Sequence, residues 1–513
     1  MTHAGYRGIL RSTSIIGGAS IVNILIGLIR VKVAATFLGP AGIGLIGLMT
    51  NLIGVASNVA ALGLGTVGTK QIAEAAASKV PDDLQASRRI LFWATTLSAL
   101  LGGAIFWVIR DIVANHILAG ALSADQVGWL SIGVTLTVIA GSQVALLNGL
   151  RRIGDLARQS VYSAALGTAT ACLALYFWRV DAVIVFVLLP LAFSCFFGFT
   201  YTRKIPRTAT SQALHWREAI EKMSPIFRLG LAIMFAGLAM TVGQLCVRTI
   251  IQRQLGVEAL GLFESSWMIS MTYIGFVLKA MGTDYYPRLT KDISNSKTTN
   301  RVVNEQTEVA LLLAAPVFLA MFTMSPWVIQ LLYSERFLGA VGILRWQIIG
   351  DLLKVLSWPL GYVLLAAGKG RLFMLCETTV VLVFVLSSWV AIPLIGLQGA
   401  GVGFLLMYVV LLPLVHFLVK TKTNFHWEKF VFFYALSICC AFLSIYVLSL
   451  WNQPVSNAWG GVLTIGFSLF GVHRLSTLAG FSKYGNSRVA KISSKLMKSA
   501  IEKYEIAKKG FKK

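Results

Sequence analysis

Charged side chains are scarce in this sequence. Asp, Glu, Lys and Arg make up 13% of its 513 residues, and only 21 residues are acidic against 45 that are basic. Soluble globular proteins carry about 25% charged residues. The low content of charged residues excludes an ordinary soluble domain. The shortage of acids leaves a net charge of +24, and its distribution along the chain has to be explained.

Residues for metal or nucleotide chemistry are also few. The six histidines are scattered, and the six cysteines lie in apolar runs without metal-ligand spacing. We therefore predict no metal site and a packing role for the cysteines. The sequence contains no GxxxxGK[ST] phosphate-binding loop, so it indicates neither ATP nor another cofactor.

Long apolar runs fill most of the chain. Hydrophobic residues make up 56% of it, and stretches of about 20 such residues, each long enough to cross ~30 Å of hydrocarbon, recur along it. We predict an all-α polytopic membrane protein whose first span is not cleaved. The fourteen predicted spans are 14–37, 41–63, 89–109, 128–150, 159–178, 181–202, 225–250, 259–281, 306–333, 341–367, 372–395, 399–419, 428–450 and 456–473.

The basic residues are distributed unequally between the two sides of these spans. The inner loops and termini hold thirty-four, whereas the outer loops hold only Arg110, Arg179, Arg253 and Arg336. This bias predicts that both termini are cytoplasmic. The positive charge then indicates topology and attraction to anionic inner-leaflet lipid, and not binding of nucleic acid. Residues 474–513 form either an amphipathic helix on that leaflet or a solvated basic tail.

Two pairs of similar segments indicate an internal duplication. Residues 38–45, LGPAGIGL, resemble residues 255–262, LGVEALGL, at an interval of 217. Residues 146–153, LLNGLRRI, resemble residues 365–372, LAAGKGRL, at an interval of 219. The first pair predicts a helix end and a tight turn at the Gly-Pro and Gly-Val junctions.

The interval places the first span on the seventh, the fourth span on the tenth, and Gly149 on Gly368. Because six spans separate equivalent helices, the two halves have the same orientation, with a pseudo-two-fold axis along the membrane normal. We expect two six-helix bundles around a central cleft, which suits alternating access. The predicted parts are an N-terminal bundle 1–202, a cytoplasmic linker 203–224, a C-terminal bundle 225–419, two appended helices 420–473 and the basic tail 474–513.

Apart from Arg89 and Lys429, which stand at the cytoplasmic ends of their spans and are counted with the inner loops, seven basic residues lie inside the predicted spans. A lone charge there costs about 3 kcal/mol or more at the bilayer centre. The seven are Arg30, Lys32, Arg228, Arg248, Lys279, Arg345 and Lys354. Those near a span end can snorkel to the interface, which is our interpretation of Lys32, Arg228, Lys279 and Arg345. Arg30, Arg248 and Lys354 lie deeper and are our candidates for binding an anionic headgroup, because arginine suits phosphate.

The acidic residues that lie clearly inside the spans, away from the span ends, are Glu264, Asp351 and Glu377. Asp351 precedes Lys354 by three residues, so the two can pair on one helix face, as a structural salt bridge or as part of a site. Glu264 lies at a depth comparable to that of Arg248 and is a possible counter-charge for it. All three acids are candidates for coupling transport to an ion gradient.

The run FLGPAGIGLIGLMTNLIGVASNVAALGLGTVGTKQIAE at 37–74, with the fourteen spans in two halves, resembles the Wzx-type polysaccharide flippases. These belong to the multidrug/oligosaccharidyl-lipid/polysaccharide (MOP) exporter superfamily. The resemblance implies a MATE-like fold and movement of an undecaprenyl-pyrophosphate-linked oligosaccharide across the bacterial inner membrane. It implies a cationic lumen for the pyrophosphate-sugar head, where Arg30, Arg248 and Lys354 are candidates by depth, and other glycan-assembly membrane proteins as partners.

Other functions remain open at this point. A lipid II flippase and a multidrug cation exporter belong to the same superfamily, although the excess of basic over acidic residues in the spans disfavours the exporter. A membrane glycan polymerase or ligase is disfavoured because the longest outer loop, 110–127, lacks clustered acids or histidines. We therefore expect a transporter and not an enzyme.

Overall fold

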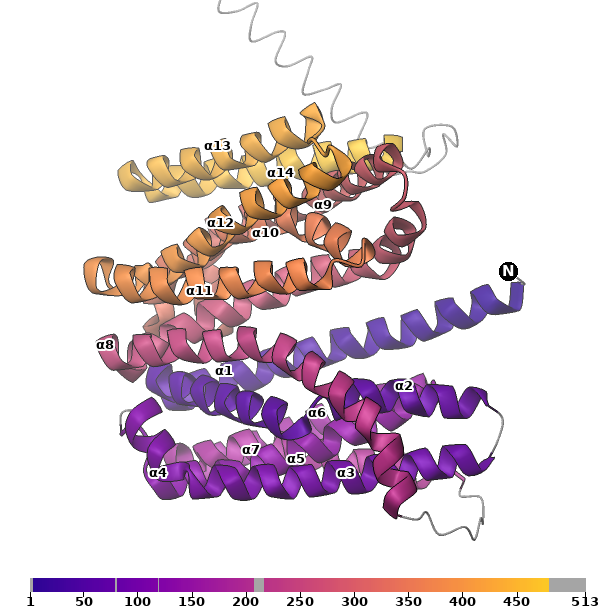
Figure 1. Cartoon of the computed structure of the whole chain (residues 1–513). Helices are drawn as coiled ribbons and strands as arrows, with labels where there is room; N and C mark the ends of the chain where they lie inside the picture. The colour runs from indigo at the N-terminus through magenta and orange to yellow at the C-terminus, as the bar shows by residue number, and fades with distance from the viewer. Residues whose placement is uncertain (1–2, 79–80, 119, 207–215, 479–513) are drawn as a thin grey trace, which may run out of the picture. The chain divides into compact units, whose positions relative to one another are not determined.

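The computed structural model describes residues 3–78, 81–118, 120–206 and 216–478, and every regular element in these ranges is helical (Figure 1). Most of the basic tail, for which an amphipathic helix is one prediction, lies outside the described residues, as does the middle of the predicted linker. The α-helices are α1 (His3–Ala61), α2 (Leu64–Ala77), α3 (Pro81–Val108), α4 (Arg110–Ile112), α5 (Ala124–Gly149), α6 (Ile153–Trp178), α7 (Val183–Arg203), α8 (Trp216–Asp292), α9 (Ser296–Leu332), α10 (Val341–Ala366), α11 (Gly370–Ile395), α12 (Gln398–Thr423), α13 (Lys429–Trp451) and α14 (Gln453–Leu478). Short helical turns are η1 (Val113–Ile117), η2 (Arg179–Ala182) and η3 (Glu335–Ala340).

Two of these helices, α1 and α8, are interrupted by a glycine. Gly39 has φ 65° and ψ −166°, and Gly256 has φ 87° and ψ 175°. This backbone conformation is essentially restricted to glycine. The two glycines occupy the same position in the duplicated LGPAG and LGVEA segments, so the predicted helix ends at both junctions are confirmed.

The helical segments agree with the predicted spans. Ten stretches of the described residues are long and apolar enough to cross a membrane. Two of them, Ile15–Ala61 and Ile153–Arg203, contain a break and cover two predicted spans each. The spans predicted at 225–250 and 259–281 lie on α8, on either side of its glycine. The chain is an all-α polytopic membrane protein.

The interval between the LGPAG and LGVEA segments recurs in the helix boundaries. Helix α10 begins and ends 217 residues after α5, and α11 begins and ends 217 residues after α6. Each of these four helices has 26 residues. The turns after α5 and α10 each have one residue with positive φ, Arg151 at 54° and Gly368 at 69°. The turns after α6 and α11 also have one each, Arg179 at 46° and Gly396 at 65°. The interval of 219 is therefore wrong, because Arg151, and not the helical Gly149, corresponds to Gly368.

The correspondence does not extend to every element. The first half has a break at Leu62 and Gly63, both with positive φ, and then the separate helix α2, in a segment predicted to be an inner loop. The equivalent part of α8 continues as helix to Asp292. Two six-helix bundles related by a two-fold axis stay a prediction.

The described residues form two compact units. One contains the residues up to Ser265 with Ile329–Ala340 and Phe384–Ala400, and the other contains Ser266–Val328, Val341–Val383 and the residues from Gly401 onward. In the first unit α1, α3, α5, α6 and α7 pack against one another, with α2 on α3 and α5. In the second unit α13 packs along α14 and contacts α10.

Glycines bring α1 and α8 into backbone contact inside the first unit. A Cβ atom on Gly44 would meet the backbone of Val257, and one on Gly261 would meet the carbonyl of Pro40. Gly44 corresponds to Gly261 in the duplication, and Pro40 corresponds to Val257, so the two contacts are equivalent. Helices whose backbones approach this closely require small residues at the crossing.

Candidate functional site

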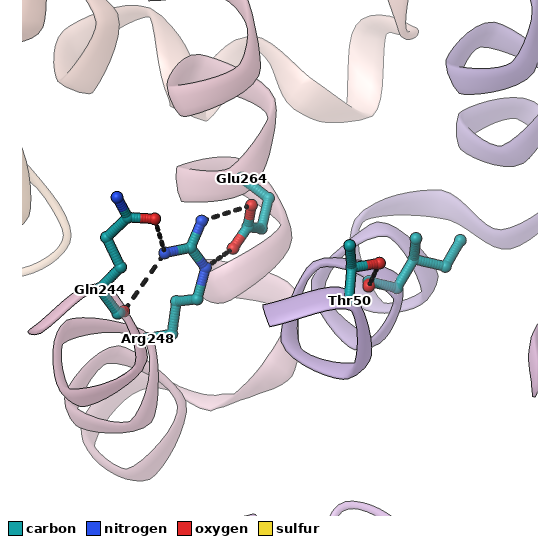
Figure 2. Close-up of polar contacts among 5 residues, drawn as sticks. Thr50, Gln244, Arg248 and Glu264 are labelled. Carbon is teal, nitrogen blue, oxygen red and sulfur yellow. Dashed lines mark hydrogen bonds and ion pairs between the residues drawn. The ribbon is translucent and has the colours of Figure 1, made fainter. Parts of the chain in front are cut away.

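Arg248 and Glu264 form a buried ion pair between the two segments of α8 (Figure 2). Their side chains are only 6% and 5% exposed. Nε and Nη2 of Arg248 donate to the two carboxylate oxygens of Glu264, and Nη1 donates to the Gln244 carbonyl at 3.2 Å. The bend at Gly256 brings the two side chains together. The counter-charge of Arg248 is therefore Glu264, in the bidentate geometry that favours arginine.

Helix α1 leaves room for this pair at Gly47. A Cβ atom there would overlap the Glu264 side chain. Thr50, one turn further along α1, has its hydrogen bond within that helix, where its hydroxyl donates to the Ile46 carbonyl at 2.7 Å (Figure 2). Gly47 is the residue that corresponds to Glu264 in the duplication, so a glycine in one half accommodates the carboxylate at the equivalent position of the other.

Arg30 on α1 contacts α7 at Phe186. Its Nη2 donates to the Phe186 carbonyl at 2.9 Å, and its guanidinium lies 4.5 Å from the centre of the Phe186 ring. Pro190 follows Phe186 by four residues and has no N–H, so the helix leaves this carbonyl without its usual donor. Arg30 supplies that donor and gains a cation–π contact.

Arg345 on α10 makes the same set of contacts with α9. Its Nε donates to the Phe322 carbonyl at 3.3 Å, and its guanidinium lies 5.3 Å from the Phe322 ring centre. Pro326 again stands four residues after the phenylalanine. Arg345 was predicted only to snorkel to the interface, but it has a hydrogen-bond partner inside the protein.

A polar pocket of about 310 Å³ lies beside Arg30, between α1, α6 and α7. Its polar lining comprises Asn23, Arg30, Ser160, Ser163 and Thr168. The Asn23 amide donates to the Ser160 hydroxyl at 2.7 Å, whereas the buried Nε of Arg30 and Oδ1 of Asn23 have no hydrogen-bond partner among the described residues. None of the described residues that line this pocket is acidic. The pocket therefore offers hydrogen-bond donors and one cation without a carboxylate beside it.

Asp351 on α10 is fully buried in the second unit. Its Oδ2 accepts hydrogen bonds from the hydroxyls of Ser270 and Tyr273 on α8, both at 2.6 Å. Its Oδ1 has no hydrogen-bond partner among the described residues. Sequence reasoning identified the carboxylate but missed both hydroxyl donors, because they lie on another helix far away along the chain.

Lys354 does not form the expected ion pair with Asp351. Among the described residues its Nζ makes one hydrogen bond, to Sδ of Met271 at 3.7 Å, and lies 5.8 Å from the Tyr408 ring centre. Glu377 on α11 lies near enough to interact electrostatically with Lys354 but makes no ion pair with it. The second unit thus holds a lysine and two carboxylates close together without a direct salt bridge between these three described residues.

The remaining predictions about intramembrane cations and cysteines have mixed outcomes. Nζ of Lys32 donates to the carbonyls of Gln330 at 3.2 Å and Tyr333 at 2.7 Å, so it too has partners in the protein. The side chains of Arg228 and Lys279 lie outside what the structure describes. Among the cysteines the packing role is confirmed for the buried Cys376 and wrong for two exposed residues of α13, Cys439 and Cys440.

Solved structures with a similar fold identify the fold class. The lipid II flippase MurJ in an inward closed conformation matches with a TM-score of 0.70 at 12% identity, covering 90% of this chain and 99% of that one. An inward-facing multidrug resistance MATE family transporter of the MOP superfamily matches with a TM-score of 0.63 at 15% identity, covering 78% and 96%. With its apolar helices and buried polar groups, the chain has the fold that these transporters share.

The sequence comparison then gives the family. Residues 33–342 match the family model described as "Polysaccharide biosynthesis protein". The chain belongs to this family. The lipid III flippase of Escherichia coli (strain K12) is 24% identical over 405 residues, which cover 76% of this chain and 93% of that protein. The predicted resemblance to polysaccharide flippases of the MOP superfamily is confirmed.

Proposed function

We propose that the protein flips an undecaprenyl-pyrophosphate-linked oligosaccharide from the inner to the outer leaflet of the bacterial inner membrane. It works by alternating access, and a cationic central cleft binds the pyrophosphate-sugar head. Membership in the polysaccharide biosynthesis family supports this proposal, and so does a similar protein named as a lipid III flippase. The excess of basic residues in the predicted inner loops supports cytoplasmic termini.

The pocket beside Arg30 is the observation that carries the proposal. It combines a guanidinium with three hydroxyl side chains and the Asn23 amide, and none of its described lining residues is acidic. Phosphate oxygens accept charge-assisted hydrogen bonds from such donors. Nη2 of Arg30 is bound to the Phe186 carbonyl, which holds the guanidinium beside the pocket, and no described lining residue offers a carboxylate to match its charge.

The three proposed cations do not have the same role. Arg248 already has its charge matched by Glu264, and its contribution is to fix the bend of α8. Arg30 in the first unit and Lys354 in the second have no ion pair with a described carboxylate, so each keeps a charge for an anionic group. For coupling to an ion gradient we favour Asp351, because its buried Oδ1 is left to take a proton or a cation, with Glu377 as the second group near Lys354.

Transport in proteoliposomes tests the proposal. The substrate is a fluorescent polyprenyl-pyrophosphate oligosaccharide, and its arrival in the opposite leaflet is followed by a membrane-impermeant quencher. We expect Arg30→Gln to raise the apparent KM at least tenfold, because a hydrogen bond to a charged group contributes roughly 1.5–3 kcal/mol. The matched control is Arg345→Gln, which removes a guanidinium with the same carbonyl and ring contacts.

The control separates binding from structure. If Arg30 only satisfies the carbonyl freed by Pro190, both variants will have similar KM values and similar losses of stability, and the head-binding role falls. Flipping that is unchanged in wild-type protein when the pyrophosphate glycan is replaced by a neutral glycolipid would overturn the substrate class. A second series with and without a pH gradient tests coupling, in which Asp351→Asn should abolish the stimulation by the gradient.

A further inference from the structure

A second groove, of about 580 Å³, lies on the first unit between α3, α5 and α7. It is distinct from the pocket beside Arg30 and shares no described lining residue with it. Its rim carries Arg88 and Arg89 near the start of α3 and Arg203 at the end of α7. The groove therefore opens at the ends of helices whose flanking residues are basic.

Two arginines of this rim have no acidic partner among the described residues. Arg89 and Arg203 are exposed and form no ion pair with a described carboxylate, and the Arg203 guanidinium lies 4.1 Å from the Phe199 ring centre. Nη1 of Arg88 donates to the Pro206 carbonyl at 3.1 Å, which is a neutral acceptor. The charges of Arg89 and Arg203 therefore attract an anion to the rim.

The walls of the groove change from basic to aromatic within one helical turn. Phe92 and Trp93 follow Arg89 on α3, and Phe199 precedes Arg203 on α7 by four residues, about 6 Å along the helix axis. These three rings are 54%, 63% and 44% exposed. Exposed aromatic rings at this depth below basic residues are typical of the interface between headgroups and acyl chains.

We propose that this groove binds an anionic glycerophospholipid of the cytoplasmic leaflet. The phosphate lies between Arg89 and Arg203, and the acyl chains run along the rings of Phe92, Trp93 and Phe199. Charge complementarity selects an anionic headgroup, and the aromatic walls one turn deeper fit hydrocarbon chains. The leaflet follows from the predicted orientation, because Arg203 lies in the predicted cytoplasmic linker and Arg89 at the predicted cytoplasmic end of a span.

Native mass spectrometry of the full-length protein tests this site. The protein is transferred into micelles with phosphatidylglycerol or phosphatidylcholine of identical chains, and the retained lipid is counted. We expect wild-type protein to retain phosphatidylglycerol in preference to phosphatidylcholine. R89Q/R203Q should retain at least fivefold less phosphatidylglycerol than wild type. R89K/R203K, which keeps both charges, should stay within about twofold of wild type. The matched control K420Q/K422Q removes two exposed lysines at the end of α12 and should retain as much lipid as wild type.

Three results would overturn the proposal. The first is equal retention of both phospholipids by the wild-type protein. The second is an equal loss in R89Q/R203Q and K420Q/K422Q, which would indicate only general attraction to charge. The third is displacement of phosphatidylglycerol from the groove by equimolar polyprenyl phosphate, which would assign the groove to that lipid. Retention is measured without the oligosaccharide, so failure here leaves the transport proposal unaffected.

Discussion

A guanidinium among apolar helices needs hydrogen-bond acceptors, and two prolines provide them in this protein. Pro190 and Pro326 each free a phenylalanine carbonyl, and Arg30 and Arg345 each donate to one of these carbonyls and lie against the same ring. Backbone groups that lose their helical partner inside a membrane must be satisfied by neighbouring helices. Each arginine and its carbonyl thus stabilise one another.

The pair formed by Arg248 and Glu264 gives a prediction at the residue scale. Removing one partner leaves the other as a buried uncompensated charge, which costs roughly 3–5 kcal/mol. We expect Glu264→Gln and Arg248→Met each to lower the unfolding temperature markedly in detergent-solubilised protein. The double variant Arg248→Met with Glu264→Leu should recover most of the loss, because an apolar pair carries no unmatched charge. Single variants with wild-type stability would show that the pair is not formed.

The contact between Glu264 and α1 gives a second prediction at this scale. Gly47→Ala places a methyl group where the Glu264 side chain lies, and overpacking of this kind costs about 1–3 kcal/mol. Gly54→Ala, on the same helix segment with open space around its Cβ position, should be neutral or stabilising. Unfolding temperatures of both variants, and of Gly47→Ala combined with Glu264→Ala, provide the measurement. The combination should relieve the strain, and equal destabilisation by Gly47→Ala in both backgrounds would contradict the contact.

At the scale of elements, the glycine breaks determine how α1 and α8 fold back. Gly256 combines a positive φ with open space where a Cβ would lie, so any cost of substitution comes from the backbone alone. We expect Gly256→Ala to destabilise by about 1–3 kcal/mol, the cost of a conformation that only glycine adopts readily. Gly275→Ala is the matched control on the same helix, has equally open space, and should stabilise slightly. Thermal unfolding distinguishes them, and two similar melting curves would mean that Gly256 is not strained.

Apolar length alone was sufficient to predict the spans, because a run of about 20 hydrophobic residues has few alternatives to a helix. The duplicated Gly-Pro and Gly-Val junctions were predictable because glycine occupies both positions. The second junction was misaligned, since Arg151 adopts the left-handed conformation that Gly368 adopts in the other half. The partners of the buried cations were not predictable either, because carbonyls, hydroxyls and a thioether on distant helices leave no signal in the local sequence.

At the scale of the whole molecule, the distribution of charge and the proposed direction of transport must agree. A flippase that collects its substrate from the cytoplasmic leaflet needs its basic loops on that side. There the basic residues keep the loops cytoplasmic when the protein inserts into the membrane, and they attract anionic lipid. The same orientation places the groove between Arg89 and Arg203 in the cytoplasmic leaflet. An inverted chain would therefore contradict the proposed direction and the proposed lipid site together.

Labelling from one side of the membrane tests this orientation. Single cysteines replace Glu258, in the predicted outer turn beside Gly256, and Lys369, in the predicted inner turn between α10 and α11, in a background without the native cysteines. Both positions are exposed in the structure. We expect a membrane-impermeant maleimide to label Glu258→Cys in intact spheroplasts and to label Lys369→Cys only after permeabilisation. Labelling in the reverse order would place the basic loops outside, and the direction of transport would then have to be reversed.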